Sequence, residues 1–290
     1  MQTMLRWGLL FVGYWPLPLL HALGVVAGLL LWWLPNGLRA VTLRHMELCL
    51  PGFTPEQRRR IARRSLIESM KAVIEAPAIW FGPDWRLRRW LGSAEEKRAL
   101  CSTIASANGI ILLTPHLGAW ELTCQFAAQF GPMTLLYKPQ KGALDALIQK
   151  GRTRNPNARP MPTSTRGVKA LLAALGRGET VGLLPDHDPP EGSGRFAPLF
   201  GIPAHSMDLV GKLSARTGAP VWFVLAERRS WARGFRFHLI RAPDGIADAG
   251  SSAAALNQGV EACVMRLPEQ YWWSYQRYRR HPPGTKSLYR

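Results

Sequence analysis

Acidic residues, lysine and cysteine are all scarce in this sequence of 290 residues. Only 19 Asp and Glu stand against 37 Lys and Arg, which gives a formal net charge of +18. Lysine supplies 8 of the 37 basic residues, so most of the charge comes from arginine. Such an excess favours a negatively charged partner, such as nucleic acid, anionic lipid or an acidic protein. Biased codon usage is the alternative explanation.

The few cysteines exclude two other classes of protein. Cys49, Cys101, Cys124 and Cys263 are widely spaced and form no CxxC pair. The spacing therefore indicates neither a zinc site nor a disulfide framework, and reduced thiols are the default expectation. Because 47% of the residues are hydrophobic, the chain is not disordered and can bury a sizeable core.

Charge is absent altogether between Trp7 and Leu38. Within this stretch residues 9–34 are almost wholly apolar, and as one helix they would be about 39 Å long, against a hydrocarbon core of about 30 Å. Pro16 and Pro18 interrupt the run, so the sequence is compatible with a kinked membrane span and with a half-inserted anchor.

The residues around the apolar run argue against a cleaved signal peptide. Only Arg6 precedes the run, and no small-x-small cleavage site follows it. Basic residues follow instead, and the positive-inside rule then places the body of the protein in the cytoplasm. We predict a single N-terminal membrane anchor over residues 1–38 and one α/β domain over residues 39–290.

The rest of the chain alternates between helical and strand-like segments. Thr54, Pro55 and Gln57 have the pattern of a capped helix start, and this helix is expected to reach about Trp80. Its basic residues 58–64 could lie on an anionic membrane surface or simply face water. Expected strands are 109–114, 133–137, 180–185, 221–227 and 235–240; expected helices are 94–107, 119–130, 166–177, 207–217 and 253–267. The alternation predicts a mixed central sheet covered by helices.

The clearest candidate for chemistry is His116, which follows the apolar run 109–114. Ligands of open α/β folds sit at the carboxyl ends of strands. Glu121 comes five residues later, about 140° around an ideal helix, so it reaches the imidazole only if His116 lies in the loop before the helix. A carboxylate on imidazole fixes its tautomer and makes a general base. A structural strand-end histidine is the alternative.

Two more motifs lie next to expected strands or helices. Ser164 and Thr165 can cap the helix 166–177, which would place Arg166 at an anion-binding helix start, whereas a merely solvent-exposed arginine is the alternative. Asp186, His187 and Asp188 follow the strand 180–185 and could bind a metal or shape a substrate pocket. Two carboxylates and one imidazole are few ligands, so we favour the substrate-shaping role.

The tail mixes aromatic and basic side chains. Between Tyr271 and Arg280 it holds three Tyr, two Trp and three Arg. RNA stacking is one interpretation of such a segment. Core packing together with an interfacial aromatic belt is the other, and the apolar N-terminus favours it.

These motifs and their order along the chain resemble those of the lauroyl and myristoyl transferases of lipid A biosynthesis. That family belongs to the wider group of glycerolipid acyltransferases with a His-x4-Asp/Glu motif. The resemblance covers nearly the whole chain. The residues that carry it are His116 to Glu121, Thr165-Arg166-Gly167, Pro185-Asp186-His187-Asp188, residues 196–201, Gly218-Ala219-Pro220-Val221 and the tail from Pro268. Pro115 departs from the pattern, since many members carry Asn there.

The resemblance implies secondary acylation of a phosphorylated glucosamine disaccharide with 3-hydroxyacyl chains, a lipid A precursor, on the cytoplasmic side of a bacterial inner membrane. The donor would be acyl-acyl carrier protein, which is acidic. His116 would be the base and Glu121 would orient it. Arg166 would hold a phosphate or the oxyanion, and Asp186, His187 and Asp188 would contact substrate. No metal, no organic cofactor and no nucleic acid would be required.

Three rival functions are open. A different lipid acceptor, such as a lysophospholipid or an ornithine lipid, would keep the same chemistry. A metal-dependent membrane hydrolase built on His116, Asp186, His187 and Asp188 would lose activity to a chelator. A membrane-tethered protein that binds nucleic acid through the basic tail would show affinity that falls with salt.

Overall fold

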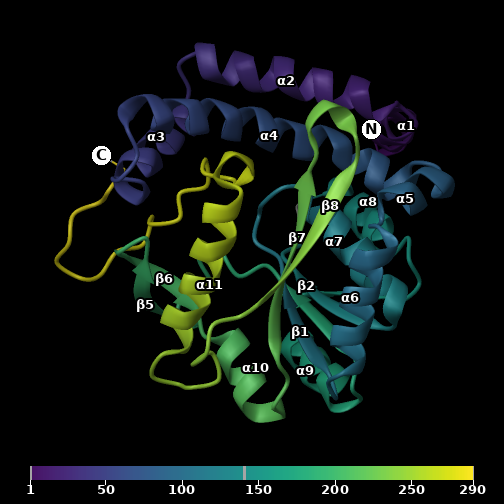
Figure 1. The fold of residues 1–290 in the computed structure, drawn as a ribbon, viewed down its shortest axis with the longest axis vertical. Helices are drawn as coiled ribbons and strands as arrows, with labels where there is room; N and C mark the ends of the chain where they lie inside the picture. The colour runs from purple at the N-terminus through teal and green to yellow at the C-terminus, as the bar shows by residue number, and fades with distance from the viewer. Residues whose placement is uncertain (1, 140–141, 290) are drawn as a thin grey trace.

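A six-stranded sheet forms the centre of the computed structural model, which describes residues 2–139 and 142–289 (Figure 1). Its strand order is β3-β2-β4-β1-β7-β8. All neighbours pair in parallel except β7 and β8, which are antiparallel. The strands are β1 (Ile110–Leu113), β2 (Met133–Tyr137), β3 (Ala158–Pro162), β4 (Thr180–Leu183), β7 (Val221–Arg228) and β8 (Phe235–Arg241). The predicted mixed sheet is confirmed.

Helices cover both faces of the sheet, as the prediction required. In β1 the side chains of Ile111 and Leu113 enter one hydrophobic core, while Ile110 and Leu112 enter the other. A strand with two buried faces reads as a continuous apolar run, which is why this strand was recognisable in the sequence. The helices are α1 (Gln2–Gly13), α2 (Leu17–Trp33), α3 (Gly37–Cys49), α4 (Pro55–Phe81), α5 (Asp84–Trp90), α6 (Ala94–Ala105), α7 (Trp120–Ala127), α8 (Ala143–Arg152), α9 (Thr165–Gly176), α10 (Leu209–Thr217) and α11 (Ser252–Arg266).

Two predictions about helix starts are confirmed in detail. The Thr54 hydroxyl accepts a hydrogen bond from the backbone N–H of Gln57, whose side chain accepts one from the N–H of Thr54. The Ser164 hydroxyl caps α9 by accepting from the N–H of Gly167. The hairpin of β5 (Gly194–Leu199) and β6 (Ile202–Met207) stands apart from the central sheet.

The apolar N-terminus packs on the domain. Helix α2 runs alongside α4 (Figure 1), and Leu20 of α2 is fully buried in the hydrophobic core. A Cβ atom on Gly28 would stand 2.3 Å from the Cα of Ile67, so only glycine allows the two backbones to come this close. The His21 ring also contacts the buried carboxylate of Glu75 at 2.8 Å. The α2 segment is therefore part of the packed structure.

The single membrane-anchoring helix of the prediction is not confirmed. No one helix in the described residues is long and apolar enough to cross a membrane. The segments Arg6–Gly13 and Leu17–Trp33 pass that test only as a pair, and they are bent by 116° relative to each other. The break falls at residues 14–16, where Pro16 precedes α2.

Replacing Gly28 with valine should lower the free energy of unfolding by about 1–3 kcal/mol, because the added side chain would force α2 away from α4. Gly8→Val is the matched control, since a Cβ there meets nothing within 4 Å. Thermal melts of both variants measure the difference. Equal and small shifts would mean that α2 does not pack on α4 and is a detachable anchor.

Candidate active site

His116 lies in the loop between β1 and α7, at the carboxyl end of the strand. Asp186 follows β4, which pairs in parallel with β1, so the ends of both strands meet at one edge of the sheet. The Oδ1 atom of Asp186 stands 2.9 Å from Nδ1 of His116. Its other oxygen, Oδ2, accepts a hydrogen bond of 2.9 Å from the backbone N–H of His116. One carboxylate therefore holds both the ring and the loop.

The charge on Asp186 determines the tautomer of this imidazole. Burial alone would raise the pKa of Asp186, but the electrostatic interaction with the His116 ring and the hydrogen bonds from His116 outweigh burial and hold that pKa well below its usual range. An ionised Asp186 can only accept hydrogen bonds, so Nδ1 of His116 carries the proton and Nε2 keeps its lone pair. The side chain of His116 is 14% exposed, which leaves the ring open to a substrate.

Aromatic rings enclose the imidazole of His116. His187 stacks on it with ring centroids 3.7 Å apart and planes within 4°, and Tyr275 stacks on the far side of His187 at 4.0 Å. Burial, then the electrostatic interaction with the adjacent His116 ring, lowers the pKa of His187 to about 3, so His187 is neutral at physiological pH. The indoles of Trp120 and Trp272 lie 5.5 and 6.4 Å from the His116 ring.

The prediction that Glu121 contacts the His116 ring is wrong, because Asp186 occupies that position. Glu121 starts α7, and its carboxylate instead accepts hydrogen bonds from Nε1 of Trp80 at 3.0 Å and from the guanidinium of Arg152. Burial raises the pKa of Glu121, but Arg152 and, to a smaller extent, His116 lower it below its ordinary value. Glu121 is therefore an ionised neighbour of the site, without a direct bond to His116.

Arg166 is exposed at the start of α9, and the structure does not bring it together with His116. The preceding strand, β3, is separated from β1 by β2 and β4. Neighbouring strands lie about 4.8 Å apart, so the ends of β3 and β1 are about 14 Å from each other. A substrate contact of Arg166 stays a prediction.

The three side chains of the Asp-His-Asp motif point to three different partners. Asp186 bonds to His116, His187 stacks between two rings, and Asp188 accepts a hydrogen bond from Nδ1 of His205 at 2.7 Å. Residues 2–139 and 142–289 contain no group of three His, Cys, Asp or Glu arranged to hold a metal ion. His205 on β6 and Arg152 on α8 had no local signal in the sequence, because both reach the site only through the fold.

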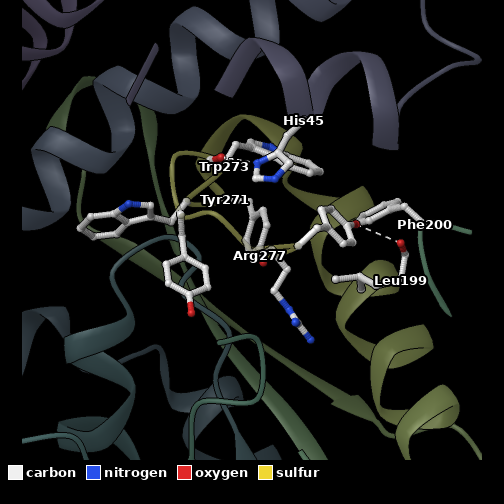
Figure 2. Close-up of a pocket in the computed structure, with 9 residues that line it drawn as sticks. His45, Leu199, Phe200, Tyr271, Trp273 and Arg277 are labelled. Atoms are coloured by element: carbon white, nitrogen blue, oxygen red, sulfur yellow. Dashed lines mark hydrogen bonds between the residues drawn. The ribbon is translucent and has the colours of Figure 1, made fainter. Parts of the chain in front are cut away.

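The C-terminal segment passes directly over the site. The backbone N–H of Trp272 donates a 3.0 Å hydrogen bond to the carbonyl of His116, and Tyr271 forms an isolated β-bridge with Leu117. Tyr271, Trp273 and Tyr278 are buried, which confirms the core-packing interpretation for these side chains. They line a cavity of about 10 Å³, shown in Figure 2, which has room for no more than one water molecule.

The fold and the site together define an α/β protein with a histidine–carboxylate pair at a strand end. Residues 4–280 match the family profile of the bacterial lipid A biosynthesis acyltransferases. The chain belongs to this family, as its motifs predicted, and it is an acyltransferase.

Proteins of known function show the same likeness across the chain. The sequence is 29% identical over 280 residues to the lipid A biosynthesis palmitoleoyltransferase of Escherichia coli (strain K12), covering 94% of this chain and 89% of that protein. It is 29% identical over 281 residues to the lauroyltransferase of the same organism, covering 94% and 90%. A lipid A biosynthesis acyltransferase of Haemophilus influenzae is 27% identical over 283 residues, covering 94% and 89%.

Proposed function

We propose that this protein transfers a fatty acyl chain from acyl-acyl carrier protein to a hydroxyl of a phosphorylated lipid A precursor, with His116 as the general base. The observation that carries the proposal is the bond between Asp186 and Nδ1 of His116, which leaves Nε2 unprotonated on a ring that is open to substrate. The family of the chain supports the lipid A pathway.

The reaction needs one proton to move twice. Nε2 of His116 takes the proton of the acceptor hydroxyl as its oxygen attacks the thioester carbonyl. The tetrahedral intermediate then expels the carrier's thiolate, which receives the proton from the imidazolium. The carboxylate of Asp186 stabilises the imidazolium between these steps, and the new ester leaves with the acceptor. This sequence requires only groups of the protein and the two substrates.

Glu121 acts in this scheme through Arg152. The two side chains form a buried ion pair beside His116, and losing the carboxylate would leave the guanidinium charge unbalanced next to the imidazolium. Glu121→Gln should therefore lower kcat/KM by roughly tenfold or more, as expected for the loss of a charge-assisted hydrogen bond. Kinetics of Glu121→Gln, Arg152→Gln and the double variant measure this.

The double variant distinguishes the two possible roles of Glu121. If Glu121 acts through Arg152, the double variant loses no more activity than the worse single variant, because the pair works as one unit. An unaffected Arg152→Gln beside an inactive Glu121→Gln would show instead that Glu121 acts on His116 or on substrate directly.

An apolar stripe on the N-terminal helices supports attachment to a membrane surface. On α2 the exposed large side chains recur every three or four residues, which places them on one face: Leu19, Leu23, Val26, Leu30 and Trp33. The opposite face packs on α4. Trp231 at the tip of the β7–β8 hairpin is 90% exposed, and this hairpin reaches α2 (Figure 1). We place this surface on the cytoplasmic side of the inner membrane.

Val26→Glu should weaken binding to vesicles that contain phosphatidylglycerol, because it puts a charge in the middle of the apolar stripe. Met265→Glu on α11 is the control, since it also adds one charge at an exposed apolar helix position. Co-sedimentation gives the bound fraction of each variant. The attachment surface lies elsewhere if both variants bind like the wild type.

An assay with purified components tests the proposed reaction. The protein is incubated with acyl-acyl carrier protein and a phosphorylated tetra-acylated glucosamine disaccharide. The molecular mass of the lipid product is then measured by mass spectrometry. We expect one added acyl chain per acceptor and the same rate with a chelator present. If only a lysophospholipid is acylated, the acceptor is a lysophospholipid and not a lipid A precursor. Hydrolysis that stops with chelator and returns with added metal would favour the hydrolase.

A further inference from the structure

Two arginines of the C-terminal segment have no part in the proton transfers described above. The Nε atoms of Arg279 and Arg280 both approach the same oxygen of Asp188, at 2.7 and 3.2 Å. The Asp188 side chain is fully buried, and its other oxygen is held by His205. A fixed carboxylate thus anchors the two guanidinium groups next to each other.

The anchoring leaves the far ends of both guanidinium groups available. In the described part of the chain, the terminal nitrogens of Arg279 and Arg280 have no hydrogen-bond partner. The two side chains are 46% and 34% exposed, so solvent and a ligand can reach them while Nε stays on Asp188. The terminal nitrogens of a guanidinium group match the spacing of phosphate oxygens.

The charge balance around the pair is positive. Asp188 contributes one negative charge against the two arginines. Arg277 adds a third guanidinium, which is buried and donates hydrogen bonds to the carbonyl of His205 and the hydroxyl of Ser206. In the described ranges the Nε of Arg277 has no hydrogen-bond partner, and its terminal nitrogens bond to neutral groups. Figure 2 shows its side chain pointing away from His45. An anion would therefore be attracted to this corner.

The arginine pair has a defined position relative to His116. The stack of His116, His187 and Tyr275 leads from the reacting ring toward the pair, and Cζ of Arg279 lies 5.9 Å from the Tyr275 centroid. A ligand bound there would lie beside the reacting atoms without covering them. This geometry suits an acceptor whose hydroxyl is on an acyl chain and whose phosphate is on the sugar.

We propose that Arg279 and Arg280, anchored on Asp188, bind a phosphate monoester of the acceptor lipid and so present its hydroxyl to His116. This inference rests on the proposed function and assigns to the C-terminal segment the phosphate contact that the sequence suggested for Arg166. Asp188 is then a positioning residue, since it orients the two arginines and does not touch substrate.

The test compares two acceptors, the phosphorylated glycolipid and the same glycolipid after phosphatase treatment. The readout is the ratio of their kcat/KM values. We expect the wild type to prefer the phosphorylated acceptor, and we expect the Arg279→Gln/Arg280→Gln double variant to lose that preference by roughly tenfold or more per arginine, mostly through KM. The double variant Arg236→Gln/Arg241→Gln on β8 removes the same charge from exposed positions and should keep the preference.

Single variants guard against loss of folding. Arg280→Gln leaves Asp188 paired with Arg279 and His205, so it should fold and show part of the effect. A second check replaces both arginines with lysine. This double variant keeps two positive charges beside Asp188 but removes the planar guanidinium groups, and it should also reduce the preference for the phosphorylated acceptor.

Several results would overturn the inference. One is an equal fractional loss on both acceptors, which would indicate a structural role. Another is a rise in KM for the acyl carrier protein alone, which would place the phosphate of the carrier's prosthetic arm at the arginines. A third is a wild type that does not distinguish the acceptors but acylates both, and this would leave the proposed function standing. Absence of acyl transfer to either acceptor would instead refute the proposed function.

Discussion

Replacing His116 with alanine should lower the rate of acyl transfer about 10²–10⁴-fold, the range that a positioned general base supplies. The alanine variant keeps no group at the position of Nε2 that could accept the hydroxyl proton. The neighbouring His187 cannot take over as the base, because its pKa is lowered to about 3.

A matched control shows whether the loss is specific. His281 is exposed near the C-terminus, and its hydrogen bonds within the described residues go to Pro282 and Thr285, so His281→Ala should leave the rate unchanged. Circular dichroism of both variants should match the wild type. Substantial transfer by a folded His116→Ala protein would show that another group is the base.

Replacing Asp186 with asparagine should be nearly as damaging, about 10²–10⁴-fold in kcat. Asparagine has almost the same shape but no negative charge, so it neither fixes the Nδ1–H tautomer nor stabilises the imidazolium. It can also offer its amide to Nδ1, which would turn the ring into the tautomer that carries the proton on Nε2. Steady-state kinetics on the phosphorylated acceptor measure the loss in kcat.

Two comparisons decide whether Asp186 acts through His116. The double variant with His116→Ala should be little worse than the worse single variant, because the two residues work as one unit. Asp244→Asn makes the same chemical change at an exposed aspartate and should have no effect. Fully additive losses in the double variant would mean that Asp186 acts independently of His116.

The sheet and the position of the site could be predicted from local patterns. Buried parallel strands are short apolar runs, and the loop after such a run is where α/β proteins place functional groups. His116 and Asp186 were both found by this reasoning. The edge strand β3 was not, because Pro160 and Pro162 argue against a strand, and only an edge position tolerates the missing N–H groups.

The pairing inside the site could not be predicted from spacing along the chain. Glu121 is five residues from His116 and Asp186 is seventy, yet Asp186 is the partner, because β4 lies next to β1 in the sheet. The partner of Glu121, Arg152, comes from α8, which had no clear signal in the sequence. Strand order is a property of the whole fold, and the motif His-x4-Glu does not contain it.

The N-terminal segment shows the same limit. Its lack of charge indicates contact with something apolar but does not say what. In the structure one face of α2 meets α4, with Gly28 against Ile67, while the other face exposes its large side chains. This division into a packed face and an exposed face was hidden in the sequence because both faces are apolar.

The most direct test of the central claim is mass spectrometry of lipid A from cells that lack the gene and carry either the wild-type protein or His116→Ala. If this chain acylates a lipid A precursor with His116 as its base, cells without the gene lack one secondary acyl chain. The wild-type protein restores that chain, and His116→Ala, present at the same level in the membrane fraction, does not. Unchanged lipid A in the deletion strain, or full restoration by His116→Ala, would contradict the account.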